Sequence, residues 1–308
     1  RWDVSQGDDF SYMFDNNNIF FQDLSIWNTS QGNNFRQMFD STEMINNGWS
    51  ATPVSSDFVG KTITGDTSSE SINGGRGNDV LNGLDGNDVI EGGDGWDRII
   101  GGKGNDTLNG GLKDDILIGG DGDDTYIVDS ASDAVTESSS EGTDLIQSSV
   151  TFTASDNVEN LTLTGSGNID ATGNSSDNTL TGNSGNNTLN GGSGDDTLDG
   201  GLGDDFLVGD SGNDIMAGGS GVDSLFGGDG HDALVGNAGN DLLSGEGFSD
   251  SLHGGDGNDS LFGEDGDDIL YGDTDDDLLV GSTGADTLYG GSGADTLLGG
   301  INDDRLYG

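Results

Sequence analysis

The sequence predicts an all-β fold, a parallel β-solenoid with 18 residues per coil, preceded by a short leucine-rich-like segment. Three observations lead to this prediction. Glycine and aspartate dominate the composition, a nine-residue pattern recurs in register over most of the chain, and one apolar residue recurs at the eighth position of the pattern. Glycine and aspartate are both poor helix formers, so a helical bundle is excluded.

The charge of the chain narrows the possible functions. Among 308 residues there are 58 acidic and 8 basic side chains, 59 glycines and no cysteine, with a formal net charge of −50. Nucleic acid is not expected as a partner, because its phosphates would repel this chain. No stretch approaches the roughly 18 apolar residues of a membrane span. Low hydrophobicity with such a charge is typical of disorder, so we expect the chain to fold only with a positively charged partner.

Residues 1–49 carry a repeat of their own. Trp2-Asp3-Val4-Ser5 recurs as Trp27-Asn28-Thr29-Ser30, and the segment 10–15 recurs as 35–40, both at an offset of 25. This period suits one leucine-rich-like coil per repeat. The pattern resembles the WDVS…F..MF repeats of bacterial surface proteins and mycoplasma-type lipoproteins. Residues 50–64, which contain the single proline Pro53, are predicted to be a junction.

The nine-residue repeats fall into two blocks, block I (65–127) and block II (173–308). Examples are GGKGNDTLN (101–109), GGSGDDTLD (191–199) and GGDGNDSLF (254–262). Position six is Asp in nearly every unit, and position eight is apolar. The last three residues of a unit, x-L-x, alternate as a short strand with one buried side chain. The six before them supply a turn in which glycine permits positive φ.

Two units therefore make one coil, and aspartates 18 residues apart are expected to lie about 4.8 Å from each other along the edges of the solenoid. Stacked carboxylates at that distance repel one another. A hard dication bound by carboxylate and carbonyl oxygens would relieve the repulsion. The alternative, an acidic glycine-rich linker, does not account for leucine that stays in register.

These nonapeptides resemble the GGxGxDxUx repeats of RTX proteins. The resemblance implies a parallel β-roll, expected to be right-handed, with each Ca²⁺ between neighbouring turns of one edge. It implies about 4 sites in block I and 11 in block II, about fifteen Ca²⁺ in all. The position-six carboxylates that it implies as metal ligands are Asp79, Asp88, Asp97, Asp106, Asp115, Asp124, Asp196, Asp205, Asp214, Asp223, Asp232, Asp241, Asp250, Asp259, Asp268, Asp277, Asp286, Asp295 and Asp304.

Several units depart from the pattern and are expected to bind weakly. The fourth-position Gly is replaced by Lys113, Phe248, Asp275 and Asn302, and the sixth-position Asp by Glu70, Asn178 and Asn187. Residues 128–172, the connecting segment, lack the glycine-aspartate turns but alternate like short strands. We interpret this segment as a metal-poor, parallel-β continuation of the solenoid. A separate small β domain is the alternative.

The sequence predicts no enzyme and no catalytic or cofactor-binding residue. His231 and His253 occupy variable positions and form no HExxH zinc motif. No serine has a plausible histidine partner for a nucleophilic triad. RTX repeats also accompany exported proteases, lipases and polysaccharide epimerases, so a non-catalytic module of such an enzyme, or of a toxin, remains an alternative.

The expected function is that of a secreted, calcium-binding structural or adhesive protein of a bacterial cell surface, exported by type I secretion and folded into a rigid rod by calcium. Position nine is expected to face solvent, placing Tyr271, Tyr289 and Tyr307 on one face and Phe226 and Phe262 on the other. Exposed apolar rows usually mark a binding surface, which suggests self-association, laterally or end to end, or a cell-surface partner. Aromatic pairs that only stabilise the sheet are the alternative.

The sequence lacks the regular rows of threonine that ice binding would require. The chain is also expected to be a piece of a longer polypeptide.

Overall fold

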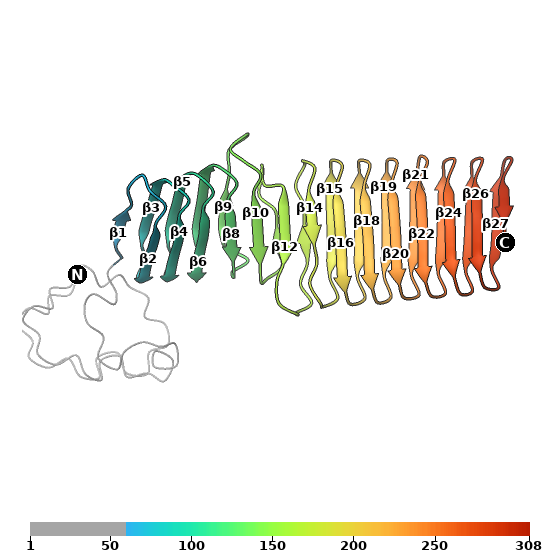
Figure 1. The fold of residues 1–308 in the computed structure, drawn as a ribbon, viewed down its shortest axis with the longest axis horizontal. Coiled ribbons are helices and arrows are strands. Elements are labelled where there is room, and N and C mark those ends of the chain that lie inside the picture. Colours follow the sequence, from blue (N-terminus) through green and yellow to red (C-terminus); the bar gives the residue numbers. More distant parts are fainter. Residues whose placement is uncertain (1–59) are drawn as a thin grey trace, which may run out of the picture.

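The structure, a computed structural model, describes residues 60–308. The repeats predicted for residues 1–49, and the junction up to residue 59, lie outside the described residues. The described part is built from strands and turns, and its coils are stacked into a long rod (Figure 1). It contains no helix that could span a membrane.

The strands follow one another at short intervals along the chain. They are β1 (Thr62–Thr64), β2 (Ser71–Arg76), β3 (Val80–Asp85), β4 (Val89–Asp94), β5 (Arg98–Lys103), β6 (Thr107–Leu112), β7 (Ile116–Asp121), β8 (Thr125–Val128), β9 (Ala134–Thr136), β10 (Leu145–Ser148), β11 (Phe152–Thr153), β12 (Asn160–Leu163), β13 (Ala171–Thr172), β14 (Thr179–Thr181), β15 (Thr188–Ser193), β16 (Thr197–Leu202), β17 (Phe206–Ser211), β18 (Ile215–Ser220), β19 (Ser224–Asp229), β20 (Ala233–Ala238), β21 (Leu242–Gly247), β22 (Ser251–Asp256), β23 (Ser260–Asp265), β24 (Ile269–Thr274), β25 (Leu278–Thr283), β26 (Thr287–Ser292), β27 (Thr296–Ile301) and β28 (Arg305–Tyr307).

All paired strands are parallel, and within the blocks each pairs with the second strand along the chain. In block II, for example, Leu252 lies opposite Leu270, and Leu261 opposite Leu279. The even-numbered strands form one 14-stranded sheet, while the odd-numbered strands form a five-stranded sheet (β1 to β9) and a nine-stranded sheet (β11 to β27). The predicted all-β parallel solenoid with 18 residues per coil is confirmed.

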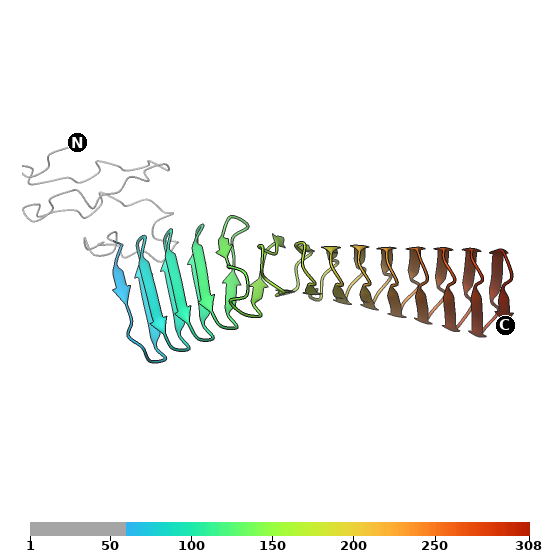
Figure 2. The ribbon, with the colours of Figure 1, turned by 90° about the horizontal axis from the view of Figure 1, so that it is seen from above.

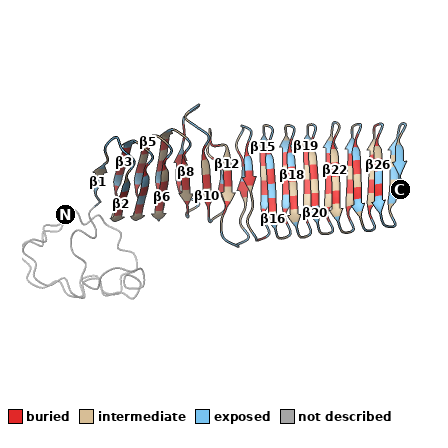
Figure 3. Cartoon of the chain, in the orientation of Figure 1, coloured by how far each residue is buried: buried red, intermediate tan, exposed pale blue. Residues whose placement is uncertain are grey.

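The core is a ladder of the position-eight side chains. Leu81, Leu198 and Leu261 are among the residues with no more than 1 % of their surface exposed, and Met216 and Tyr126 replace leucine at the same position. The residues on either side of position eight face outward, so buried residues alternate with more exposed ones along most strands, as in β23 (Figure 3). Because one side chain per strand fills the interior, the two sheets lie close together and the solenoid is flat.

The strands are longer than predicted. The pattern predicted three residues, x-L-x, but a typical strand such as β23 has six and includes the first three residues of the following unit. The second residue of the unit, usually glycine, lies within the strand with a positive φ, for example +111° at Gly255 in β22, and pairing with the next coil continues there. The turn is therefore made by positions four to six alone.

The chain stays in the solenoid through the connecting segment. Strands β8, β10, β12 and β14 pair in sequence within the 14-stranded sheet, although Leu145 pairs with Thr125 and with Asn160 at offsets that differ from those in the blocks. On the opposite side, β9 ends the five-stranded sheet and β11 begins the nine-stranded sheet. The orientation of the sheets changes along this segment, as Figure 2 shows.

Candidate metal centres

Each predicted ligand ends a tight turn between two strands. In block II, Gly257, Asn258 and Asp259 connect β22 to β23, and Gly257 adopts a φ of +125° that lets the chain reverse direction. The side chain of Asp259 turns inward, so that only 2 % of the residue is exposed. A charged side chain this deeply buried needs a partner of opposite charge or several hydrogen bonds.

One oxygen of each of these carboxylates is used to connect the coils. The backbone N–H of Asp241 donates to Oδ1 of Asp259 at 2.8 Å, and the N–H of Asp259 donates to Oδ1 of Asp277 at 2.9 Å. The predicted ligands are thereby brought together in rows along the two edges of the solenoid. The rows are Asp79–Asp97–Asp115 and Asp88–Asp106–Asp124 in block I, and Asp196–Asp214–Asp232–Asp250–Asp268–Asp286–Asp304 and Asp205–Asp223–Asp241–Asp259–Asp277–Asp295 in block II.

The second oxygen, Oδ2, is buried and has no hydrogen-bond partner. This holds for every predicted ligand except Asp295 and Asp304, which belong to the last two turns and are less buried. Buried polar atoms are nearly always satisfied in proteins, and a carboxylate oxygen without a donor is especially costly. Such an atom, repeated in turn after turn, offers an oxygen that a cation would satisfy.

A small cradle lined by oxygen surrounds each Oδ2. A Cβ atom placed on Gly254, the first glycine of its unit, would lie 2.3 Å from Oδ2 of Asp259 and 2.9 Å from the carbonyl oxygen of Gly272 in the next coil. Oδ2 and a backbone carbonyl therefore face the same space. Only glycine leaves that space open, which explains why the first position of the repeat carries it.

The electrostatics of the rows favour a bound cation. Burial raises the pKa of Asp223 to about 7, the N–H of Asp205 lowers it in part, and the charge of Asp241 raises it further. Burial likewise raises the pKa of Asp250 to about 8, with the N–H of Asp232 opposing this rise. Neutral pH is therefore close to the pKa of these carboxyl groups, and their buried negative charge is unfavourable without a partner. A divalent cation would satisfy the same need.

In two turns an asparagine replaces the aspartate, and its side chain forms hydrogen bonds within the protein. Asn178 donates its amide hydrogens to the carbonyls of Val158 (3.0 Å) and Glu159 (3.3 Å), and its Oδ1 accepts the N–H of Asn174. Asn187 likewise donates to the carbonyl of Ile169 at 2.6 Å. Both asparagine side chains are satisfied by the protein itself, whereas the aspartates of the other turns are not.

At the first coil a positively charged side chain of the protein, that of Lys61, lies beside this type of oxygen. The ammonium of Lys61 donates a hydrogen bond to the carbonyl oxygen of Gly74, while the backbone N–H of Lys61 donates to Asp79. The carbonyl of Gly74 is equivalent to that of Gly272, which lines the cradle of Asp259. A positive charge can therefore reach this type of carbonyl. Carboxylate and carbonyl oxygens, with no nitrogen or sulfur donor, form the ligand set that Ca²⁺ prefers. The residues that line the cradles therefore fit a bound Ca²⁺.

Sequence reasoning missed four acidic residues in the connecting segment, three of which extend the rows. Oδ1 of Asp133 accepts the N–H of Asp115, and Oδ1 of Asp144 accepts the N–H of Asp124. Glu159 accepts the N–H of Asp144, and Glu137 is buried nearby. The offset of 18 from Asp115 could have identified Asp133. Asp144 was concealed because its offset from Asp124 is 20.

The units with an unusual fourth residue retain the backbone of the turn. Lys113, Phe248, Asp275 and Asn302 all adopt positive φ, between 74° and 96°. Side chains other than glycine are strained in this region. The prediction that these turns bind weakly therefore has a physical basis in the backbone, but the aspartates that follow them keep their places in the rows.

Filling one cradle should destabilise the calcium-loaded rod. In the variant Gly254→Ala the new Cβ would fall 2.3 Å from Oδ2 of Asp259, which must move away from the position that a cation would share. We expect a loss of about 1–3 kcal/mol in the free energy of unfolding. The measurement is urea denaturation at millimolar Ca²⁺, followed by circular dichroism.

The matched control is Gly247→Ala at the end of β21, in the preceding unit. A Cβ there would meet its nearest atoms at 3.5 and 3.7 Å, which is ordinary van der Waals contact. We expect a change within about 0.5 kcal/mol. Equal destabilisation by the two variants would show that the cradle has no special role.

The comparisons with known families agree with this geometry. Eight segments, which together cover residues 64–134 and 172–308, match the model of the RTX calcium-binding nonapeptide repeat. Residues 1–63 match a family described as a Mycoplasma protein of unknown function. No curated protein matches the chain. Because the matched repeats cover more than half of the sequence, the chain belongs to the family of RTX calcium-binding nonapeptide-repeat proteins, as its motifs predicted.

Proposed function

We propose that this chain is the calcium-folded rod of a secreted structural or adhesive protein on a bacterial cell surface, without catalytic activity of its own. The observation that carries the proposal is the row of buried Oδ2 atoms without partners. In the metal-free chain these carboxylates repel one another and lack solvation. Bound Ca²⁺ supplies the opposite charge and takes oxygen ligands. Folding is therefore coupled to the calcium concentration around the protein.

This coupling suits export. Extracellular calcium modules bind at about 10⁻⁴–10⁻³ M, well above the concentrations at which cytosolic sensors respond. The chain would stay unfolded inside the cell, where an extended chain can be secreted, and become a rod outside. RTX repeats are typical of exported proteins, which supports this proposal.

Calcium titration tests the proposed folding. Circular dichroism should report an unfolded chain below about 10⁻⁵ M free Ca²⁺ and a β-rich chain near 10⁻³ M. Magnesium at the same concentration should be much less effective, since it requires a small octahedral site and gives up its waters reluctantly. A full β spectrum in metal-stripped protein at pH 7.5 would contradict the proposal.

The exposed surface supports a second part of the proposal, lateral association with another copy. His253, Tyr271, Tyr289 and Tyr307 stack along the 14-stranded sheet, with ring centroids 4.2, 4.9 and 4.8 Å apart. We call this row the tyrosine ladder. Its members lie on alternate strands from β22 to β28, and Tyr289 and Tyr307 remain 36 % and 49 % exposed.

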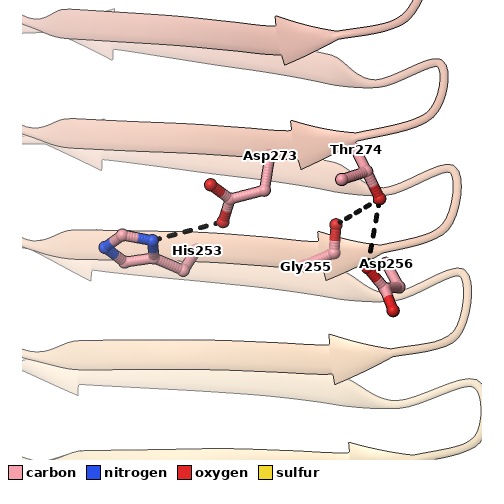
Figure 4. A network of polar contacts seen from close by, with 5 residues as sticks. All are labelled: His253, Gly255, Asp256, Asp273 and Thr274. Atoms are coloured by element: carbon pink, nitrogen blue, oxygen red, sulfur yellow. Dashed lines mark hydrogen bonds and ion pairs between the residues drawn. The ribbon is translucent and has the colours of Figure 1, made fainter.

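Polar contacts hold the start of the ladder in place. Nδ1 of His253 lies 3.3 Å from Oδ2 of Asp273, and on the neighbouring strand Thr274 donates to the carbonyl of Gly255 at 3.2 Å (Figure 4). The histidine is thus part of an ordered surface row. A flat, rigid aromatic row suits an identical row on a second rod, because little side-chain entropy remains to be lost on contact.

Light scattering on the calcium-loaded protein tests this association. Tyr289→Ser should shift the mass toward that of the monomer, whereas Leu202→Ser, which removes an exposed apolar side chain away from the ladder, should not. Phe262→Ser changes the nine-stranded sheet, so an effect confined to that variant would assign the contact to the opposite face. A wild-type monomer at all concentrations would defeat the assembly proposal.

A further inference from the structure

Three acidic residues meet where block I joins the connecting segment. Asp124 ends the last regular turn of one edge row, Asp144 follows it in the next coil, and Glu137 comes from the loop that replaces a nonapeptide turn. One oxygen from each lies within 4.8 Å of the others. Among residues 60–308 no other group of three possible metal ligands is this close together.

Two of the carboxylates carry a buried oxygen without a hydrogen-bond partner. Glu137 is only 8 % exposed, and its Oε2 has no hydrogen-bond partner. Asp124 is 1 % exposed, and its Oδ2 also lacks a partner. Three buried acids with no compensating charge are strongly unfavourable unless a cation lies among them.

The oxygens converge on one glycine. A Cβ atom on Gly119 would lie 2.1 Å from Oδ2 of Asp124, 2.1 Å from the hydroxyl of Tyr126 and 2.4 Å from Oε1 of Glu137. Tyr126 occupies a core position that is leucine in most units, and its hydroxyl donates a hydrogen bond to Glu137. The tyrosine therefore reaches from the core to the edge and orients the glutamate.

Backbone hydrogen bonds fix the other side of the cluster. The N–H of Asp124 donates to Oδ1 of Asp144 at 2.8 Å, and the N–H of Asp144 donates to Oε2 of Glu159 at 2.9 Å. The carboxylates are thus held in place by β8, β10 and the loops around them. The segments that match the RTX model end at residue 134 and resume at 172, so Glu137 and Asp144 lie outside them.

We propose that Asp124, Glu137 and Asp144 form a calcium site that binds more tightly than the regular turns and fastens the connecting segment to block I. A regular site offers two carboxylates of one edge row, whereas this cluster offers three, and calcium affinity rises with the number of charged ligands. The proposal rests on the calcium-dependent folding proposed above. It makes this junction the part of the rod that orders first as calcium rises.

Hydrogen exchange with mass spectrometry on the full chain, at a series of buffered free Ca²⁺ concentrations, tests the order of binding. Residues 119–146 should become protected at about tenfold lower Ca²⁺ than residues 245–280. The variant Glu137→Gln keeps an oxygen for the Tyr126 hydroxyl but removes a charged ligand. It should raise the calcium midpoint of residues 119–146 by about tenfold or more and leave residues 245–280 unchanged.

Two controls separate ligation from other effects. Glu141→Gln removes the same charge from the same loop, but the carboxylate of Glu141 accepts the N–H of Ser138 at 2.9 Å and is not one of the three clustered ligands. The calcium midpoint of residues 119–146 should therefore shift far less than in Glu137→Gln. Asp232→Asn should weaken block II alone. Without metal, Glu137→Gln should increase protection of residues 119–146, because it removes a buried charge. If Glu137 had only a structural role, the variant Glu137→Gln would lower the protection of residues 119–146 both with and without calcium.

Equilibrium dialysis with calcium measures binding directly and adds a second readout to hydrogen exchange. At the free Ca²⁺ that protects only residues 119–146, the wild type and Glu141→Gln should hold about one ion and Glu137→Gln none. Equal binding by the wild type and Glu137→Gln would overturn the inference. If residues 245–280 gain protection with calcium while Glu137→Gln changes nothing, this inference alone fails. If no segment responds to calcium, the proposed function fails as well.

Discussion

Metal-stripped protein is expected to gain β structure as the pH falls from 8 to 5. Burial raises the pKa of Asp97 and Asp232 to about 6, with coil-to-coil N–H donors opposing the rise and neighbouring aspartates adding to it. Burial raises the pKa of Asp124 to about 7 in the same way. An aspartate in the unfolded chain titrates near 3.8. Between these values the folded state binds more protons than the unfolded state.

The direction of the effect follows from this difference. Stability decreases with rising pH wherever the folded state holds the additional protons. The contribution of these carboxylates is therefore fully present below about pH 4 and is lost as the pH rises through about 6 to 8. Acid denatures proteins whose carboxylates have lowered pKa values, and this rod should show the opposite behaviour. Protons would take the place of calcium in the cradles.

Circular dichroism between pH 5 and 8, on protein freed of metal by a chelating resin, measures the effect. In a parallel titration with calcium the apparent affinity should rise with pH, because protons and Ca²⁺ compete for the same oxygens. A metal-free spectrum that does not change from pH 8 to 5 would contradict the assigned burial of the rows. So would folding that improves as the pH rises.

Much of this structure could be predicted from the sequence because the repeat is regular. A leucine every nine residues, as at Leu252, Leu261 and Leu270, fixes the coil length and the core. The position of Asp259 in the unit places its carboxylate at an edge. The prediction of three-residue strands was wrong, because glycine was considered only as a turn former. Gly255 shows that it can also continue a strand with positive φ when the next coil pairs with it.

The junction could not be predicted for a different reason. Coils in the connecting segment change length, so Asp144 and Glu159 lie opposite residues that no fixed offset identifies. Tyr126 fits the apolar pattern and gave no signal of its polar contact with Glu137. The sequence predicts a metal-poor segment because it lacks the glycine-aspartate turns. Packing in three dimensions, which the spacing does not encode, brings these oxygens together.

Replacing one edge row of block II with asparagine is expected to halve the calcium bound by this block and to let part of the rod fold without metal. The variant changes Asp196, Asp214, Asp232, Asp250, Asp268, Asp286 and Asp304 to Asn. Asn178 and Asn187 already occupy this position within the solenoid and are buried and hydrogen-bonded. The side-chain oxygens of Asn178 and Asn187 accept N–H groups of their own turns, from Asn174 and Asn183. An asparagine carries no charge to repel its neighbours and is a weak ligand for Ca²⁺.

The matched control changes the same number of exposed acids in block II to Asn. These are Asp195, Asp204, Asp229, Asp256, Asp267, Asp276 and Asp303. Both variants lower the net charge equally, so a gain of metal-free β structure in the row variant alone would locate the repulsion in the buried rows. Equilibrium dialysis gives the calcium bound, and circular dichroism in chelator gives the metal-free fold. If the two variants fold alike without calcium, net charge alone controls folding, and the buried rows lose their role as the switch.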